Sequence, residues 1–198
     1  MLELQEYLKI FIGIFAILNP LGALPLYLSL TAHHSEHDKK YVAMTAAKAA
    51  TIILLVTLFF GELILSFFGI SVNSFRVGGG ILILLMAISM LHAQTSGAKN
   101  TEAERVEAST RESIAIVPLA MPMLAGPGAI SSIILYGNRA HDWQHYLIVS
   151  AEIVIVGIII AILMRLSGKI AKQLGQTGMN IITRVMGLIL AAISIEFI

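Results

Sequence analysis

The sequence contains no cysteine and few charged residues, and each shortage excludes a class of structure. Without cysteine the chain can form neither a disulfide nor a metal site with thiolate ligands. Only 13% of its 198 residues are charged, whereas about a quarter are charged in a typical soluble domain. Apolar residues take their place, with 57% hydrophobic residues and a mean hydropathy of +0.86. The composition therefore predicts an all-α integral membrane protein surrounded by the lipid bilayer.

Six apolar segments are long enough, or nearly so, to cross a bilayer, which takes about 20 residues. Basic residues lie in the loops between them rather than along one face, so nucleic acid is not an expected partner. We predict one membrane domain, 1–198, in which a polar linker at about 93–113 separates two halves, about 1–92 and 114–198. The six segments are Tyr7–Thr31, Val42–Phe68, Val72–His92, Ile114–Tyr136, Tyr146–Met164 and Met179–Ile198.

Lysine and arginine are distributed unequally between the two sides that six crossings define. Three of the 13 basic residues fall on the side of the termini, and the other ten fall on the opposite side. Because an excess of Lys and Arg marks the cytoplasmic side, both termini are expected outside the cytoplasm. The N-terminal stretch Met1–Glu6 carries acids where a signal peptide needs basic residues, so the first segment is predicted to stay in the mature protein.

All five prolines fall in two clusters, and each cluster lies inside an apolar segment. Proline removes a backbone donor and clashes with the preceding turn, so we predict breaks near Asn19 and near Ala125. In a bilayer the freed backbone groups need partners inside the protein or in a water-filled cavity. Paired broken helices of this kind are typical of transporter binding sites, although prolines also kink packed membrane helices without any such role. The prolines are Pro20 and Pro25 in the first segment and Pro118, Pro122 and Pro127 in the fourth.

The second half of the chain repeats features of the first half. A shift of 102 residues places Pro20–Pro25 on Pro122–Pro127, and a shift of 108 places Arg76–Gly79 on Arg184–Gly187. With three crossings in each half, the second copy must enter the membrane in the opposite orientation. We therefore predict six transmembrane helices arranged as two inverted three-helix repeats, an architecture suited to alternating access.

The residues around the prolines resemble the signatures of a known family. Asn19–Pro25 is similar to the first-span signature of the MarC family, and Pro118–Ser131 is similar to its fourth-span signature. Phe75–Gly80 and Arg184–Ile189 look like the third and sixth spans of the same family. The resemblance covers nearly the whole chain. It implies a six-span protein of the bacterial inner membrane, related to lysine-exporter-like transporters and acting on small neutral amino acids.

The two predicted breaks form our candidate substrate site. Each break leaves a half-helix whose first amides suit a carboxylate, while the carbonyls before the break suit an ammonium group or a sodium ion. Breaks that meet at the midplane would hold both ends of a zwitterion such as glycine or alanine. Glycines there let a ligand approach the backbone, whereas Gly78–Gly80 suit close helix packing. The predicted substrate-binding residues are Asn19, Pro20, Gly22, Pro25, Pro122, Gly126, Pro127, Gly128 and Ser131.

Ionisable residues inside the apolar segments are candidates for coupling or gating, because they are costly in a bilayer. Glu152 lies about one-third into the fifth segment and is our candidate for proton coupling, with an interfacial position and a structural ion pair as alternatives. Lys48 and Glu62 lie near helix ends, where snorkelling also explains them. Arg76 and Arg184 are predicted at opposite interfaces, with gating or substrate attraction as a further role. We predict no cofactor and no metal, and H+ or Na+ as the coupling ion.

The histidines are expected at surfaces. Those in the loop after the first segment are predicted to be solvated rather than to bind metal, and His141 and His145 are predicted to be interfacial, beside Trp143. The loop histidines are His33, His34 and His37.

Three classes of function remain to be compared. The first is a secondary transporter of a small neutral solute, monomeric or homo-oligomeric, and the second is a channel or a membrane accessory protein without transport. The third, an intramembrane enzyme, is disfavoured because the sequence has no zincin helix, no paired carboxylates and no phosphate loop.

Overall fold

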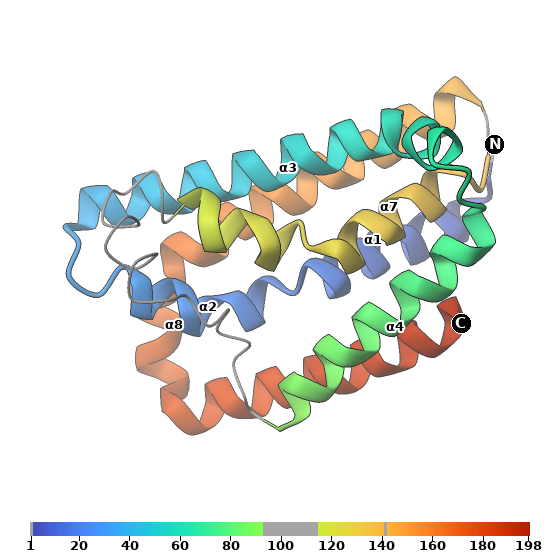
Figure 1. Cartoon of the computed structure of the whole chain (residues 1–198). Helices are drawn as coiled ribbons and strands as arrows, with labels where there is room; N and C mark the ends of the chain where they lie inside the picture. Colours follow the sequence, from blue (N-terminus) through green and yellow to red (C-terminus); the bar gives the residue numbers. More distant parts are fainter. Residues whose placement is uncertain (1, 93–114, 141) are drawn as a thin grey trace.

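The computed structural model describes residues 2–92, 115–140 and 142–198, and these ranges are helical with no strand. The helices form a single bundle, and both chain ends lie at the same end of it (Figure 1). The predicted linker and His141 lie outside the described residues. The elements are α1 (Leu4–Leu18), α2 (Pro20–Leu30), α3 (Glu36–Phe67), α4 (Val72–Leu91), the π-helix η1 (Ala115–Leu124), α7 (Pro127–Gly137) and α8 (Trp143–Phe197).

Within the described ranges, five helices are long and apolar enough to cross a membrane. The first combines α1 and α2, and the last two are the parts of α8 on either side of Gly175. Gly175 has φ 61° and ψ −177°, a conformation that glycine adopts without steric cost, and it redirects the chain between two predicted segments. The helices are Leu4–Leu30, Glu36–Phe67, Val72–Leu91, Trp143–Gly175 and Thr177–Phe197. The predicted fourth segment is divided between η1 and the shorter apolar helix α7.

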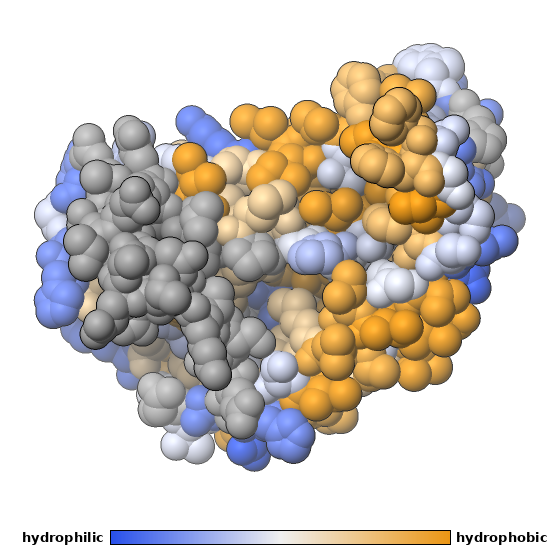
Figure 2. Space-filling model, in the orientation of Figure 1, coloured by the Kyte–Doolittle hydropathy of each residue, from blue (hydrophilic) through white to orange (hydrophobic). Residues whose placement is uncertain are grey.

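The outer surface of the bundle is apolar. On α3 the side chains of Phe59, Phe60, Leu63 and Phe67 are exposed, the last of them by 85%. Figure 2 shows apolar side chains over the centre and right of one face, with hydrophilic ones at its left and right edges and along its bottom. Soluble monomers rarely expose contiguous apolar patches of this kind, so the surface suits lipid rather than water.

The two interrupted segments lie side by side inside the bundle. α1 packs against α7, while α2 packs against η1, so the first part of each segment contacts the second part of the other. In Figure 1 both interruptions lie about halfway between the ends of the bundle. α8 packs against α1 and α2, and α3 packs against η1 and α7. Helices from both halves of the chain therefore hold the breaks in place.

Close packing of α4 depends on two of its three consecutive glycines. A Cβ at Gly79 would collide with the Ser131 side chain of α7, and a Cβ at Gly80 would meet the C-terminal residues of α8. A Cβ at Gly78 would have nothing within 4 Å. The predicted packing role therefore applies to Gly79 and Gly80, and Gly78 faces outward.

We expect Gly79→Val to destabilise the protein by about 1–3 kcal/mol, the usual cost of inserting carbon atoms into a well-packed contact. Its added side chain must push α4 away from Ser131. Gly78→Val adds the same atoms one residue earlier, into open space, and is expected to be nearly neutral. Thermal unfolding of the two purified variants in detergent makes the comparison. Equal melting temperatures would contradict the contact between α4 and α7.

Candidate functional site

The first break is centred on Asn19, which is buried and left-handed with φ 45° and ψ 58°. Asparagine tolerates this conformation better than most residues. Its backbone N–H donates to Phe15 O (3.1 Å) and ends α1, while its side-chain Oδ1 accepts from the Gly22 N–H (3.1 Å) and caps α2. Pro20 follows as the first residue of α2, where its missing N–H costs nothing. Asn19 therefore ends one helix and caps the next.

The side chain of Asn19 folds back over the start of α2. A Cβ at Gly22 would collide with it, so only glycine leaves the space that this cap needs. The other end of the amide, Nδ2, lies 3.1 Å from Met90 Sδ on α4. A thioether is a weak acceptor, so this donor can be recruited by a better partner at small cost. The first break is thus capped by its own asparagine, and Asn19 Nδ2 is a hydrogen-bond donor that can change partner.

The second break differs in construction from the first. η1 ends in a wide turn in which the Ala125 N–H donates to Ala120 O (2.8 Å), and Gly126 then extends the chain with φ −76° and ψ 175°. Pro127 opens α7, and no side chain of the described ranges caps the start of that helix. The first amides of α7 therefore present their partial positive charge without the internal partner that Asn19 supplies at α2. A π-helix of ten residues is unusual, because π-helical structure occurs mostly as single turns inside α-helices.

A cavity of about 130 Å³ opens at this second break. It exceeds the roughly 10–15 Å³ that one water needs, and it is smaller than the roughly 300–1,000 Å³ of pockets that hold drug-sized ligands. Its walls are apolar side chains and the backbone of the glycines, with no ionisable residue among them. The lining residues are Ile17, Leu82, Ile83, Met86, Met123, Leu124, Gly126, Pro127, Gly128, Ala129 and Leu190.

The remaining residues predicted for the substrate site are distributed around the two breaks. Pro20 and Gly22 are buried at the start of α2, and Pro25 is half-buried inside that helix. Ser131 is buried one turn into α7, where its Oγ donates to Pro127 O (2.8 Å) and keeps its lone pairs as acceptors. Pro122 lies in η1, and its side chain is outside the described residues.

Glu152 lies away from the breaks. It is buried on α8 and faces α1, where it lines an apolar groove of about 500 Å³ together with Tyr7 and Phe11. Its Oε2 has no hydrogen-bond partner among the described residues. Phe11 and Asn19 are separated by about 12 Å along the helix, at 1.5 Å per residue. The structure therefore does not bring Glu152 together with the candidate substrate site.

The other predicted coupling or gating residues are exposed, and none of them lines the cavity at the second break. Arg76 donates from Nε to Phe197 O (3.0 Å), which ties α4 to the C-terminal end of α8. Lys48 lies in a groove between α3 and α8. Glu62 and Arg184 lie on the outer faces of α3 and α8.

The prediction for His145 was wrong. This side chain is fully buried, with Nε2 2.8 Å from Tyr136 O and Nδ1 3.2 Å from the Tyr7 hydroxyl. It links the start of α8 to the start of α1 and to the end of α7. Tyr7 and His145 are 138 positions apart, so no local pattern in the sequence signals their contact.

Comparison with known families decides what kind of protein carries this site. The model of the family described as MarC family integral membrane proteins matches residues 4–198. The chain belongs to the MarC family. As a member, it is an integral membrane protein, in agreement with its apolar surface and long helices.

Individual relatives match along nearly their whole length. The chain is 42% identical over 196 residues to UPF0056 membrane protein YhcE of Escherichia coli (strain K12), covering 99% of this chain and 91% of that protein. It is 37% identical over 199 residues to UPF0056 membrane protein PYRAB13050 of Pyrococcus abyssi (strain GE5 / Orsay), covering 100% of this chain and 95% of the relative. No solved structure matches this MarC-family chain.

Proposed function

We propose that this protein is a secondary transporter of small neutral solutes, with small neutral amino acids as its substrate class, working by alternating access at a midplane site. One observation carries the proposal. Two interrupted helices lie against each other halfway along the bundle, and a small cavity opens where the second is interrupted. Unwound helices at membrane depth are tolerated where they line a cavity, and transporters use them to bind solutes.

The chemistry of the cavity supports the substrate class. The uncapped start of α7 suits a carboxylate, and the carbonyls at the end of η1 suit an ammonium group. A zwitterion of a few heavy atoms offers both charges at once. The apolar walls, which include no ionisable residue from the described ranges, disfavour a solute with net charge, because its unpaired charge would have to be desolvated.

We also propose that the chain crosses the membrane six times as two inverted three-helix repeats, with η1 and α7 together forming the fourth crossing. The packing supports this arrangement. Exchanging the two halves turns the contact of α1 with α7 into that of η1 with α2, and both occur. It likewise turns the contacts of α3 with η1 and α7 into those of α8 with α1 and α2, which also occur.

The two halves differ in which proline breaks the helix. The first is interrupted at Pro20 and the second at Pro127, although the shift of 102 pairs Pro20 with Pro122. The wide turns of η1 accommodate Pro122, whereas α2 continues through Pro25.

A proposed location in a bacterial inner membrane, with periplasmic termini, fits the placement of both chain ends at one end of the bundle (Figure 1).

A thermal-shift screen of the purified protein in detergent tests the proposal, with amino acids added in the presence and absence of sodium across a range of pH. A ligand that binds only the folded state stabilises it by about 2.7 kcal/mol at 100 times its dissociation constant. We expect glycine, alanine or a similar neutral amino acid to raise the melting temperature. Uptake of that amino acid into proteoliposomes should then saturate with its concentration and be inhibited by competing amino acids. Linear flux would indicate a channel, and no flux for any solute would indicate an accessory protein.

We expect Glu152→Gln to abolish uptake driven by an inward proton gradient, if Glu152 carries the coupling proton, while exchange of labelled for unlabelled solute continues. The buried carboxylate has an unsatisfied oxygen, and the amide keeps its shape but cannot exchange the proton. Glu36→Gln removes the same charge from an exposed site at the start of α3 and serves as the control. Gradient-driven uptake at the wild-type level in Glu152→Gln would remove this residue from the coupling mechanism.

A further inference from the structure

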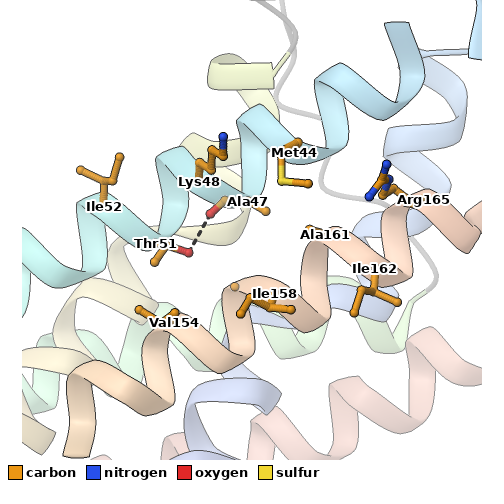
Figure 3. A pocket seen from close by; sticks show the side chains of 11 residues that line it. Met44, Ala47, Lys48, Thr51, Ile52, Val154, Ile158, Ala161, Ile162 and Arg165 are labelled. Carbon is orange, nitrogen blue, oxygen red and sulfur yellow. Dashed lines mark hydrogen bonds between the residues drawn. The ribbon is translucent and has the colours of Figure 1, made fainter. Parts of the chain in front are cut away.

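A second site lies between α3 and α8, in the part of the bundle nearer the end opposite the termini. It is a groove of about 380 Å³ whose walls are almost entirely apolar. Figure 3 shows Lys48 on the α3 wall and Arg165 on the α8 wall. The groove is separate from the cavity at the second break, with which it shares no residue. Its lining residues are Met44, Ala47, Lys48, Thr51, Ile52, Val154, Gly157, Ile158, Ala161, Ile162 and Arg165.

The floor of this groove is made of small side chains. Ala47 and Ala161 are buried, and a Cβ at Gly157 would collide with the Thr51 hydroxyl on the facing helix. That hydroxyl is already used, because it donates to Ala47 O (2.8 Å; dashed line in Figure 3). The two helices therefore touch at the floor, and the groove lies beside this contact. The space between them has the shape and polarity for a hydrocarbon chain rather than for a hydrated solute.

The rims of the groove carry exposed apolar side chains. Ile52, Ile158 and Ile162 are each at least half exposed. A groove with such rims opens onto the apolar outer surface of the bundle, which in a membrane protein is occupied by lipid tails. The occupant can therefore enter from the bilayer without crossing water.

Two positive charges lie in this apolar setting without a partner in the described part of the chain. Lys48 and Arg165 are exposed, and neither forms an ion pair or a hydrogen bond with a described residue. Lys48 is six residues into the apolar segment that begins at Val42, about 9 Å from its start at 1.5 Å per residue. A cation at that depth is costly unless a counter-charge accompanies it or its stem carries it to the interface. A phosphate held between the two walls would supply that counter-charge.

We propose that this groove binds an anionic phospholipid, with an acyl chain along the floor and the phosphate between Lys48 and Arg165. Charge complementarity supports this occupant. In the predicted six-span topology, seven basic residues of the described ranges belong to the side of the membrane opposite the termini. A zwitterionic headgroup would bring its own ammonium group toward the same cations. Basic grooves between membrane helices recognise anionic headgroups in this way. The seven residues are Lys39, Lys40, Lys48, Arg165, Lys169, Lys172 and Arg184.

Native mass spectrometry of the full chain in detergent tests the proposal by comparing phosphatidylglycerol with phosphatidylcholine. We expect the wild type to bind phosphatidylglycerol more tightly. Removing the charges in the double variant Lys48→Gln/Arg165→Gln should weaken that binding by about fivefold for each cation. The control variant Lys40→Gln/Lys172→Gln removes two exposed charges from the same end outside the groove and should bind as the wild type does.

A charge-preserving variant separates loss of binding from loss of folding. Lys48→Arg/Arg165→Lys should retain phosphatidylglycerol at close to the wild-type level. An equal loss in the control variant would overturn the proposal, because it would show a general surface-charge effect. Equal binding of the two lipids would also overturn it. So would binding of glycerol 3-phosphate as tight as that of the lipid, because the apolar groove would then contribute nothing.

Discussion

Asn19→Leu is expected to lower the free energy of unfolding by about 2–3 kcal/mol. A left-handed backbone costs an ordinary residue about 1–2 kcal/mol, and loss of the cap on α2 costs about 1 kcal/mol more. Leucine also cannot donate to Met90, and it cannot fold over Gly22 as the amide does. The cost is therefore concentrated in one buried residue that ends one helix and begins the next.

Thermal or chemical unfolding in detergent measures this effect, and Asn19→Gly is its matched control. Glycine adopts the left-handed conformation freely, so this variant loses only the side-chain contacts. We expect it to be less destabilised than Asn19→Leu by at least about 1 kcal/mol. If the two variants had the same free energy of unfolding, the left-handed turn at Asn19 would not be the feature that makes this residue necessary.

Gly126→Val is expected to abolish stabilisation by the amino acid that the screen identifies, or to weaken its binding by more than tenfold. The substitution adds three carbon atoms at the wall of a cavity of only about 130 Å³, where a ligand must approach the uncapped start of α7. The backbone itself is not the obstacle, because φ −76° and ψ 175° are available to valine and suit a residue before proline. Membrane insertion and folding should therefore continue.

Titrating the amino acid against the melting temperature of Gly126→Val measures this loss. Gly78→Val adds the same side chain where nothing lies within 4 Å of the new Cβ, and it should keep the wild-type response. A full response in Gly126→Val would place the binding site elsewhere in the bundle. A full loss in both variants would show that the effect comes from helix packing rather than from the cavity.

Much of the architecture could be predicted from local chemistry. The prolines indicated both interruptions, and the structure has them at Asn19 and at Ala125–Gly126. The capping role of Asn19 follows from an asparagine placed directly before Pro20. The five long helices overlap the predicted apolar segments, because the length of an apolar segment can be counted directly in the sequence. Each of these features depends on residues a few positions apart.

Other features depended on neighbours far along the chain, and there the predictions stopped or were wrong. His145 was expected at an interface but is buried between Tyr7 and Tyr136, because α1 and α7 cover it. Glu152 stays a candidate for proton coupling, and only the packing of α8 against α1 showed that it faces Tyr7 and Phe11. Snorkelling was an alternative explanation for Lys48, and its place in one groove with Arg165 became visible only when α3 and α8 were packed together.

The sequence by itself determined three properties of this protein: that it is an integral membrane protein, at which residues its helices are interrupted, and which family it resembles. These properties follow from hydropathy, from the missing proline N–H and from short motifs, all of which act over a few residues. Only the tertiary structure decided which breaks meet, which charges share a groove and which polar groups are buried. The reason is that such contacts join residues more than a hundred positions apart, and their geometry comes from how whole helices pack rather than from the residues themselves.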